Sequence, residues 1–206
     1  MIAEFVLPIS LALLWLAGVY FTLGFTDNKI SYALALASSA LILWKELFFL
    51  APFEKFSSIL LAYIFVASLA VALVTDFYEM LIPRFCSLWL IPFWVLFSYL
   101  EITPISFYES ISGAILGYSI LFFMGVSFKY FTGRDGLGEG DMEFLSMIGA
   151  FVGPCAVTTS LYIGSTATIL VGLPYLFFIK KDLKARLPFA PALAIGALVS
   201  FHICLF

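Results

Sequence analysis

Charged residues are scarce in this chain of 206 residues: they make up 11% of it, whereas hydrophobic residues make up 64%. A soluble domain carries about a quarter charged residues. The composition therefore excludes an ordinary soluble protein and indicates a surface that mostly faces lipid. The N-terminus also lacks the basic residues and the small-residue cleavage site of a secretory signal. We therefore expect the first apolar run to be a retained membrane span.

Histidine and cysteine, the usual zinc ligands, are almost absent. The sequence has one histidine, no Cys-x-x-Cys pair, and three cysteines in or beside apolar runs, Cys86, Cys155 and Cys204. We expect the cysteines to be small buried hydrophobic residues rather than disulfide or zinc ligands. We expect no metal, no cofactor and no nucleic-acid partner, and the sequence leaves the oligomeric state open.

The charged residues divide the chain into eight apolar runs, which we interpret as the helices of one all-α membrane domain over residues 1–206. A spanning helix needs about 20 apolar residues, so eight or nine spans would fill the chain. The runs are 3–24, 30–50, 57–75, 86–100, 106–128, 142–159, 160–179 and 188–206. No charge marks the boundary between the sixth and seventh runs. We place it near Ser160, with Gly153-Pro154 and Gly164 as alternatives.

Basic residues are retained on the cytoplasmic side of membrane proteins, and here they are distributed unequally. If the loops alternate sides, one side holds only Lys45 and Lys55. The other side holds Lys29, Arg84, Lys129, Arg134, Lys180, Lys181, Lys184 and Arg186. The pattern predicts that both termini lie outside and that the loops after the first, third, fifth and seventh runs are cytoplasmic.

Two aspartates adjoin long apolar runs on this predicted cytoplasmic side. Asp76 ends the third run, and Asp141 begins the sixth run within the sequence Gly-Glu-Gly-Asp. An ionisable residue at a membrane boundary is costly unless it pairs, shares a proton or takes part in chemistry. Each aspartate alone is more often a helix cap or a loop residue, but together, in a chain so poor in charge, they favour a functional site.

Two carboxylates that share a water cannot both ionise near neutral pH, so the pair would hold one proton. One aspartate could then activate water while the other donates to a scissile carbonyl, as in an aspartyl protease. We expect Asp141 to be the more often ionised member, because a helix start favours an anion and Asp76 lies at a helix end. We expect Gly138 and Gly140 to give the backbone conformations closed to other residues and to let a substrate strand come close.

Three segments together resemble the prepilin peptidases, the GxGD aspartyl proteases that cleave leader peptides of type IV pilin-like precursors. The segments are Asp76-Phe-Tyr-Glu-Met-Leu-Ile-Pro83, the stretch from Gly138 to Gly153, and Pro188-Phe-Ala-Pro-Ala-Leu-Ala-Ile-Gly-Ala197. The resemblance implies about eight spans and a cytoplasmic site with Asp76 and Asp141 as the catalytic pair. It implies that Gly138, Gly140 and Pro83 shape this site. It also implies the inner membrane of a prokaryote and, as substrates, precursors with basic leaders from type IV pilus or type II secretion systems.

The chain departs from the family pattern in three respects. Many members carry a large cytoplasmic domain after the first span, often with zinc-binding Cys-x-x-Cys pairs, and methylate the new N-terminus with S-adenosylmethionine. Here that loop is only about Gly24 to Lys29, so we expect a short form that cleaves leaders without methylating them. The family also usually has lysine where this chain has Glu143, and an acidic or amide residue where it has Arg84.

Four further acidic residues flank the aspartates and are candidates for contacts with a basic leader: Glu79, Asp135, Glu139 and Glu143. They could attract such a leader electrostatically, or they could form an ordinary solvated acidic loop. Two other functions stay open. One is a proton- or ion-coupled transporter that uses Asp76 and Asp141. The other is a presenilin-like intramembrane protease, because Pro191-Ala192-Leu193 matches that group's Pro-Ala-Leu.

Overall fold

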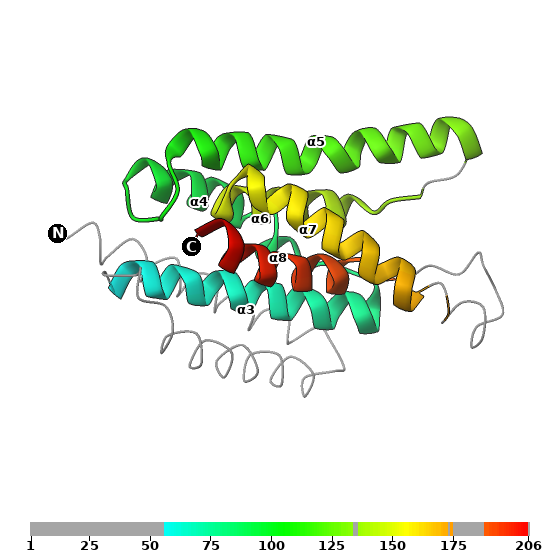
Figure 1. The fold of residues 1–206 in the computed structure, drawn as a ribbon, viewed down its shortest axis with the longest axis horizontal. Helices are drawn as coiled ribbons and strands as arrows, with labels where there is room; N and C mark the ends of the chain where they lie inside the picture. Colours follow the sequence, from blue (N-terminus) through cyan, green and yellow to red (C-terminus); the bar gives the residue numbers. More distant parts are fainter. Residues whose placement is uncertain (1–55, 134–135, 173, 175–187, 206) are drawn as a thin grey trace.

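A computed structural model describes residues 56–133, 136–172, 174 and 188–205, and all regular structure in these residues is helical (Figure 1). The predicted first and second spans lie outside the described residues. The elements are α3 (Phe56–Glu79), the short 3-10 helix η1 (Arg84–Cys86), α4 (Leu90–Tyr99), α5 (Phe107–Thr132), α6 (Glu139–Val152), α7 (Pro154–Ala167), the π-helical turn η2 (Thr168–Gly172) and α8 (Ala190–Leu205).

Three stretches of helix are long and apolar enough to cross a membrane. They are Leu60–Glu79 within α3, the whole of α5, and Pro154–Gly172, which joins α7 to η2. Shorter apolar helices cover Arg84–Tyr99 and Ala190–Phe201. The all-helical, membrane-protein character predicted from the composition is therefore confirmed, with three candidate spans among the described residues.

The boundary between α6 and α7 lies at Gly153, so the predicted boundary near Ser160 is wrong and the alternative at Gly153-Pro154 is confirmed. Gly153 has a φ of 98°, a conformation that favours glycine because it has no Cβ. Pro154 then starts α7, where its missing N–H leaves no hydrogen bond unmade. Ser160 instead lies buried within α7, and its hydroxyl oxygen is 3.1 Å from that of Ser200 on α8.

Helices α5 and α6 pack backbone against backbone. A Cβ atom added to Gly113 would lie 2.1 Å from the carbonyl oxygen of Gly149, so only glycine fits at this crossing. Two hydrogen bonds tie the same pair of helices. Ser110 on α5 donates to a backbone carbonyl of α6 at 2.7 Å, and Ser146 on α6 donates to one of α5 at 2.9 Å. Small residues and interhelical hydrogen bonds are the usual means of association in lipid.

An aromatic cluster joins four helices in the core. The ring of Phe151 on α6 lies 4.4 Å from that of Phe65 on α3 and 4.6 Å from that of Trp94 on α4. Phe201 on α8 stacks against the same ring, with a centroid separation of 6.2 Å. All four side chains are buried, so the second half of α6 is surrounded by its neighbours.

A disulfide joins Cys155 in the first turn of α7 to Cys204 in the last turn of α8. The expectation that these two cysteines are unpaired hydrophobic residues is therefore wrong, while Cys86 is buried as predicted. The sequence could not reveal the pairing, because the two residues are 49 positions apart. In the view of Figure 1, α8 runs back along α7 and brings its end beside the start of α7.

Candidate active site

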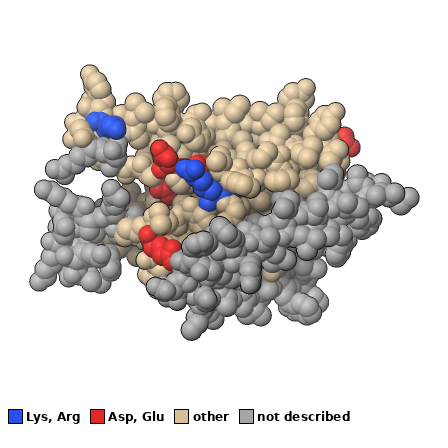
Figure 2. Space-filling model, turned by 180° about the vertical axis from the view of Figure 1, so that it is seen from behind, with Lys and Arg blue, Asp and Glu red and all other residues tan. Residues whose placement is uncertain are grey.

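The end of α3, the segment that follows it and the start of α6 enclose a cavity of about 350 Å³. Asp76 comes from α3 and Asp141 from α6, so the structure brings the two predicted aspartates to one cavity. Its lining consists of Asp76, Met80, Leu81, Ile82, Arg84, Gly138, Glu139, Gly140, Asp141 and Glu143. Most of the described surface in Figure 2 is uncharged, and several of its acidic and basic side chains gather in one area.

Asp76 is buried, with 7% of its surface exposed, and it is held by the start of α8. Its Oδ2 accepts a hydrogen bond of 2.9 Å from the backbone N–H of Ala190, the first residue of that helix, and the Phe189 backbone also hydrogen bonds to the carboxylate. The N-terminus of a helix carries a partial positive charge and free N–H groups. Burial disfavours a charge on Asp76, and these N–H groups offset part of that cost.

Asp141 lies in quite different surroundings. It occupies the third position of α6, after the N-cap Gly138, so it is not the N-cap itself. Its Oδ1 is buried and has no hydrogen-bond partner among the described residues. Burial, reinforced by the nearby charge of Asp76, raises the pKa of Asp141 from the ordinary 3.8 to about 7, against a smaller lowering by the Gly138 backbone.

The surroundings of the pair differ from those expected from the helix ends alone. The start of α6 does favour an anion, as expected, but the burial of Asp141 outweighs that effect. Asp76 instead receives the N-terminus of a second helix, α8, which lies 114 positions later in the chain. The helix-end argument therefore does not distinguish the two carboxyls, because each lies at the N-terminus of a helix and burial disfavours a charge on both.

Of the two glycines, Gly140 is the one whose lack of a side chain matters for space. Gly138 has φ −78° and ψ 144°, which any residue can adopt, so the expected conformational role is wrong for it. At Gly140, an added Cβ would lie 3.3 Å from the Cβ of Ile82, because the segment after α3 lies directly on the first turn of α6. Pro83 does not line the cavity but precedes η1.

The four flanking acidic residues occupy different positions. Glu139 lines the cavity and is exposed, whereas Glu79 is exposed but does not line the cavity. Asp135 lies outside the described residues. Glu143 lines the cavity but is buried, at 9% exposure. Of the three that are described, Glu139 is thus the one both exposed and at the cavity.

Glu143 is bound from the segment that follows α3. Its Oε2 accepts a hydrogen bond of 3.3 Å from the buried hydroxyl of Ser87, and its Oε1 lies 3.9 Å from Nε of Arg84. Among the described residues, no group of three or more His, Cys, Asp or Glu side chains is placed to hold a metal ion.

Comparison with known proteins identifies the family. The sequence model of the type IV leader peptidase family matches residues 63–175, which include both aspartates and the whole lining of the cavity. This chain belongs to the type IV leader peptidase family. No solved structure matches it at a significant level.

Several curated members of the type IV leader peptidase family are similar to this chain, and each bears the name prepilin leader peptidase/N-methyltransferase. The protein from Pectobacterium carotovorum subsp. carotovorum is 33% identical over 135 residues, which are 66% of this chain and 48% of that relative. The protein from Xanthomonas campestris pv. campestris is 35% identical over 89 residues, 43% of this chain and 31% of the relative. The chain therefore spans about half or less of the length of these relatives.

Membership of the type IV leader peptidase family favours the leader-peptidase interpretation over the transporter and presenilin-like alternatives. It also gives meaning to the two departures near the aspartates. Arg84 and Glu143 are the two positions where the charge differs from the usual pattern, and the structure places them side by side. Opposite charges therefore face each other at these two positions in this chain.

Proposed function

We propose that this protein is a membrane aspartyl endopeptidase that removes the leader peptide of type IV pilin-like precursors, with Asp76 and Asp141 as its catalytic pair. The observation that carries the proposal is the meeting of these two buried carboxyls at one cavity, where the start of α8 donates a hydrogen bond to Asp76 and burial beside Asp76 raises the pKa of Asp141 to about 7. Groups whose environments separate their protonation are suited to act as base and acid.

The contrast between the two carboxyls supports a definite division of labour. Asp76, ionised beside the start of α8, takes a proton from water as the water oxygen bonds to the scissile carbonyl carbon. Asp141 donates its proton to the carbonyl oxygen. When the resulting tetrahedral intermediate collapses, the C–N bond breaks and the departing amine takes the proton from Asp76. A hydroxyl proton then returns to Asp141, which restores the starting state.

The proposal includes a membrane arrangement for the whole chain. Residues 1–206 form one peptidase domain of eight spans in the inner membrane of a prokaryote, with both termini outside and the cavity facing the cytoplasm. Two observations support this orientation: the unequal distribution of the basic residues, and the position of the Cys155–Cys204 disulfide. Helices α6 and α8 both start at the cavity, whereas the disulfide lies where α7 starts and α8 ends. Disulfides persist on the non-cytosolic side.

Leader removal from a co-expressed pilin-like precursor with a basic leader tests the function, with cleavage followed by the change in precursor mass. We expect Asp76→Asn and Asp141→Asn each to lower turnover by about 1,000-fold or more. When two catalytic residues act as a unit, replacing either one removes nearly all of the activity. Glu101→Gln, an exposed acidic residue in the turn between α4 and α5, should cleave normally. Near-normal turnover in either aspartate variant would refute the catalytic pair.

A further inference from the structure

The segment from Met80 to Ser87 supplies much of one side of the cavity. Met80, Leu81, Ile82 and Arg84 all line it. Met80, the residue after the end of α3, has a φ of 53°, in the left-handed region that costs an ordinary residue about 1–2 kcal/mol. The segment therefore departs sharply from α3, only a few residues after Asp76, and its own position depends on what it rests against.

The segment rests on α6 at two places. Ile82 lies against Gly140, one residue before Asp141. Further along, Ser87 and Arg84 contact Glu143, two residues after Asp141. The two attachments lie on either side of Asp141 along α6. Any slippage between the segment and α6 would therefore move Asp141 relative to the end of α3, which carries Asp76.

Glu143 makes the polar attachment between the segment and α6. Its carboxylate is buried, so it needs partners to offset the loss of hydration. Ser87 is fully buried and donates to it, whereas the side chain of Arg84 is 67% exposed and contacts it from the solvent side. The carboxylate thus has two partners on the segment and little surface left for a ligand.

We propose that Glu143 is a positioning residue, which fixes the segment 80–87 against the start of α6 and so holds Asp76 and Asp141 in register. The inference rests on the proposed peptidase function. It replaces the expectation that Glu143 contacts the leader, because Glu143 is buried and already bound, whereas Glu139 is exposed at the same cavity.

Exchange of the two charges tests this role. Glu143→Lys alone places two cations side by side, and we expect kcat to fall by about 10-fold or more, within the range of coupling between contacting residues. Arg84→Glu alone should reduce kcat less, because Arg84 is mostly exposed. The double variant restores an ion pair, and Ser87 can accept from lysine where it donated to glutamate. Its kcat should recover to within about 3-fold of the unaltered chain.

A milder variant guards against loss of folding. Glu143→Gln keeps an oxygen that accepts from Ser87 but removes the charge, so kcat should fall by about 3-fold with KM unchanged. A higher KM with unchanged kcat would show instead that Glu143 binds the leader and would overturn the proposal. A double charge-exchange variant no more active than the poorer single variant would overturn it as well.

Melting temperatures separate this inference from the proposed function. The unaltered chain, Glu143→Lys, Arg84→Glu and the double variant form a cycle that can be measured in detergent without substrate. We expect the double variant to recover in melting temperature as well. If the unaltered chain cleaves no pilin-like precursor, the peptidase function fails while this cycle still reports on the Arg84–Glu143 contact. If the chain cleaves its precursor but neither cycle shows recovery, the positioning role alone fails.

Discussion

The carboxyl group of Asp141 has a buried oxygen without a hydrogen-bond partner in the described part of the chain, and it lies near the negative charge of Asp76. Both features favour a bound proton, and its pKa lies at about 7. Because Asp141 donates a proton in the proposed mechanism, kcat/KM for leader cleavage should fall as pH rises through about 7. A profile of kcat/KM against pH measures this, and a rate that stays level from about pH 6 to pH 9 would rule out Asp141 as the proton donor.

The same pKa has a consequence for stability. The pKa of Asp141 is raised from 3.8 to about 7 by folding, so between these values the folded protein binds more protons than the unfolded chain. Its contribution to stability is therefore greatest at low pH and declines as pH rises through this window. The melting temperature of the unaltered chain should therefore fall as pH rises through this window, and that of Asp141→Asn should fall less.

Glu139 is the residue on which attraction of a basic leader would depend. It is exposed and lines the cavity beside both aspartates. We expect Glu139→Lys to lower kcat/KM for a basic leader by about 10-fold at low ionic strength, with a smaller loss as salt screens the charges. Glu101→Lys makes the same change of charge in the turn between α4 and α5 and should have no such effect. Cleavage that is insensitive to both salt and Glu139→Lys would leave the acidic residues as an ordinary solvated surface.

At the scale of elements, the crossing of α5 and α6 determines the position of α6 and therefore that of Asp141. Gly113 leaves no room for a side chain there, since an added Cβ would meet the Gly149 carbonyl oxygen at 2.1 Å. Gly113→Ala should lower the free energy of unfolding by about 2 kcal/mol, a typical cost of overpacking, and should also reduce cleavage because α6 must shift.

Gly125→Ala is the matched control on the same helix. Its added methyl would meet mainly the end of the flexible Met142 side chain, at 3.2 Å, and alanine is the better helix former. Thermal unfolding in detergent should therefore separate the two variants. Equal melting temperatures would show that α5 and α6 separate at little cost.

The helices themselves could largely be predicted. The described helices overlap apolar runs, and charged or turn-forming residues mark most ends of these runs. The sequence left the boundary of α6 and α7 open among three positions, because no charge interrupts the run, and the conformation of Gly153 decides between them. The approach of Asp76 and Asp141 was anticipated from their common membrane face. The N-terminus of α8 beside Asp76 was not, because that contact joins residues 114 positions apart.

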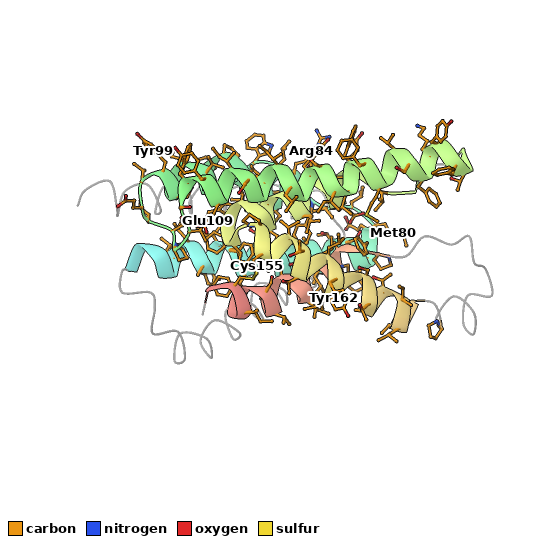
Figure 3. The ribbon with its side chains drawn as sticks, turned by 45° about the horizontal axis from the view of Figure 1, so that its top comes forward. Met80, Arg84, Tyr99, Glu109, Cys155 and Tyr162 are labelled. Atoms are coloured by element: carbon orange, nitrogen blue, oxygen red, sulfur yellow. A yellow bond between two sulfur atoms is a disulfide. The ribbon has the colours of Figure 1, made fainter. Side chains whose placement is uncertain are left out.

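At the scale of the whole molecule, the disulfide and the cavity lie at opposite ends of α8. Figure 3 shows Cys155 towards one end of the bundle, near Glu109, and Met80 of the cavity's lining towards the other. The contact between Arg84 and Glu143 could not be predicted from the sequence, because each residue considered by itself is only a departure from the family pattern.

Labelling in intact cells tests the proposed orientation. After reduction by a membrane-impermeant reagent, Cys155 and Cys204 should react with an impermeant maleimide from outside. A cysteine introduced at Glu79, which is exposed near the end of α3, should react only once the membrane is permeabilised. Cys155→Ser/Cys204→Ser is the control that should give no external labelling. Labelling of Glu79→Cys from outside would invert the arrangement.

The contact between Asp76 and the start of α8 also bears on how the protein is made. Membrane helices are inserted as they are synthesised, and α8 follows every other described element in the chain. Until Ala190 and its neighbour arrive, Asp76 lacks the two N–H groups that stabilise its charge. In the proposed mechanism, the site would therefore be incomplete until α8 has been synthesised, and cleavage would begin only after that helix is in place.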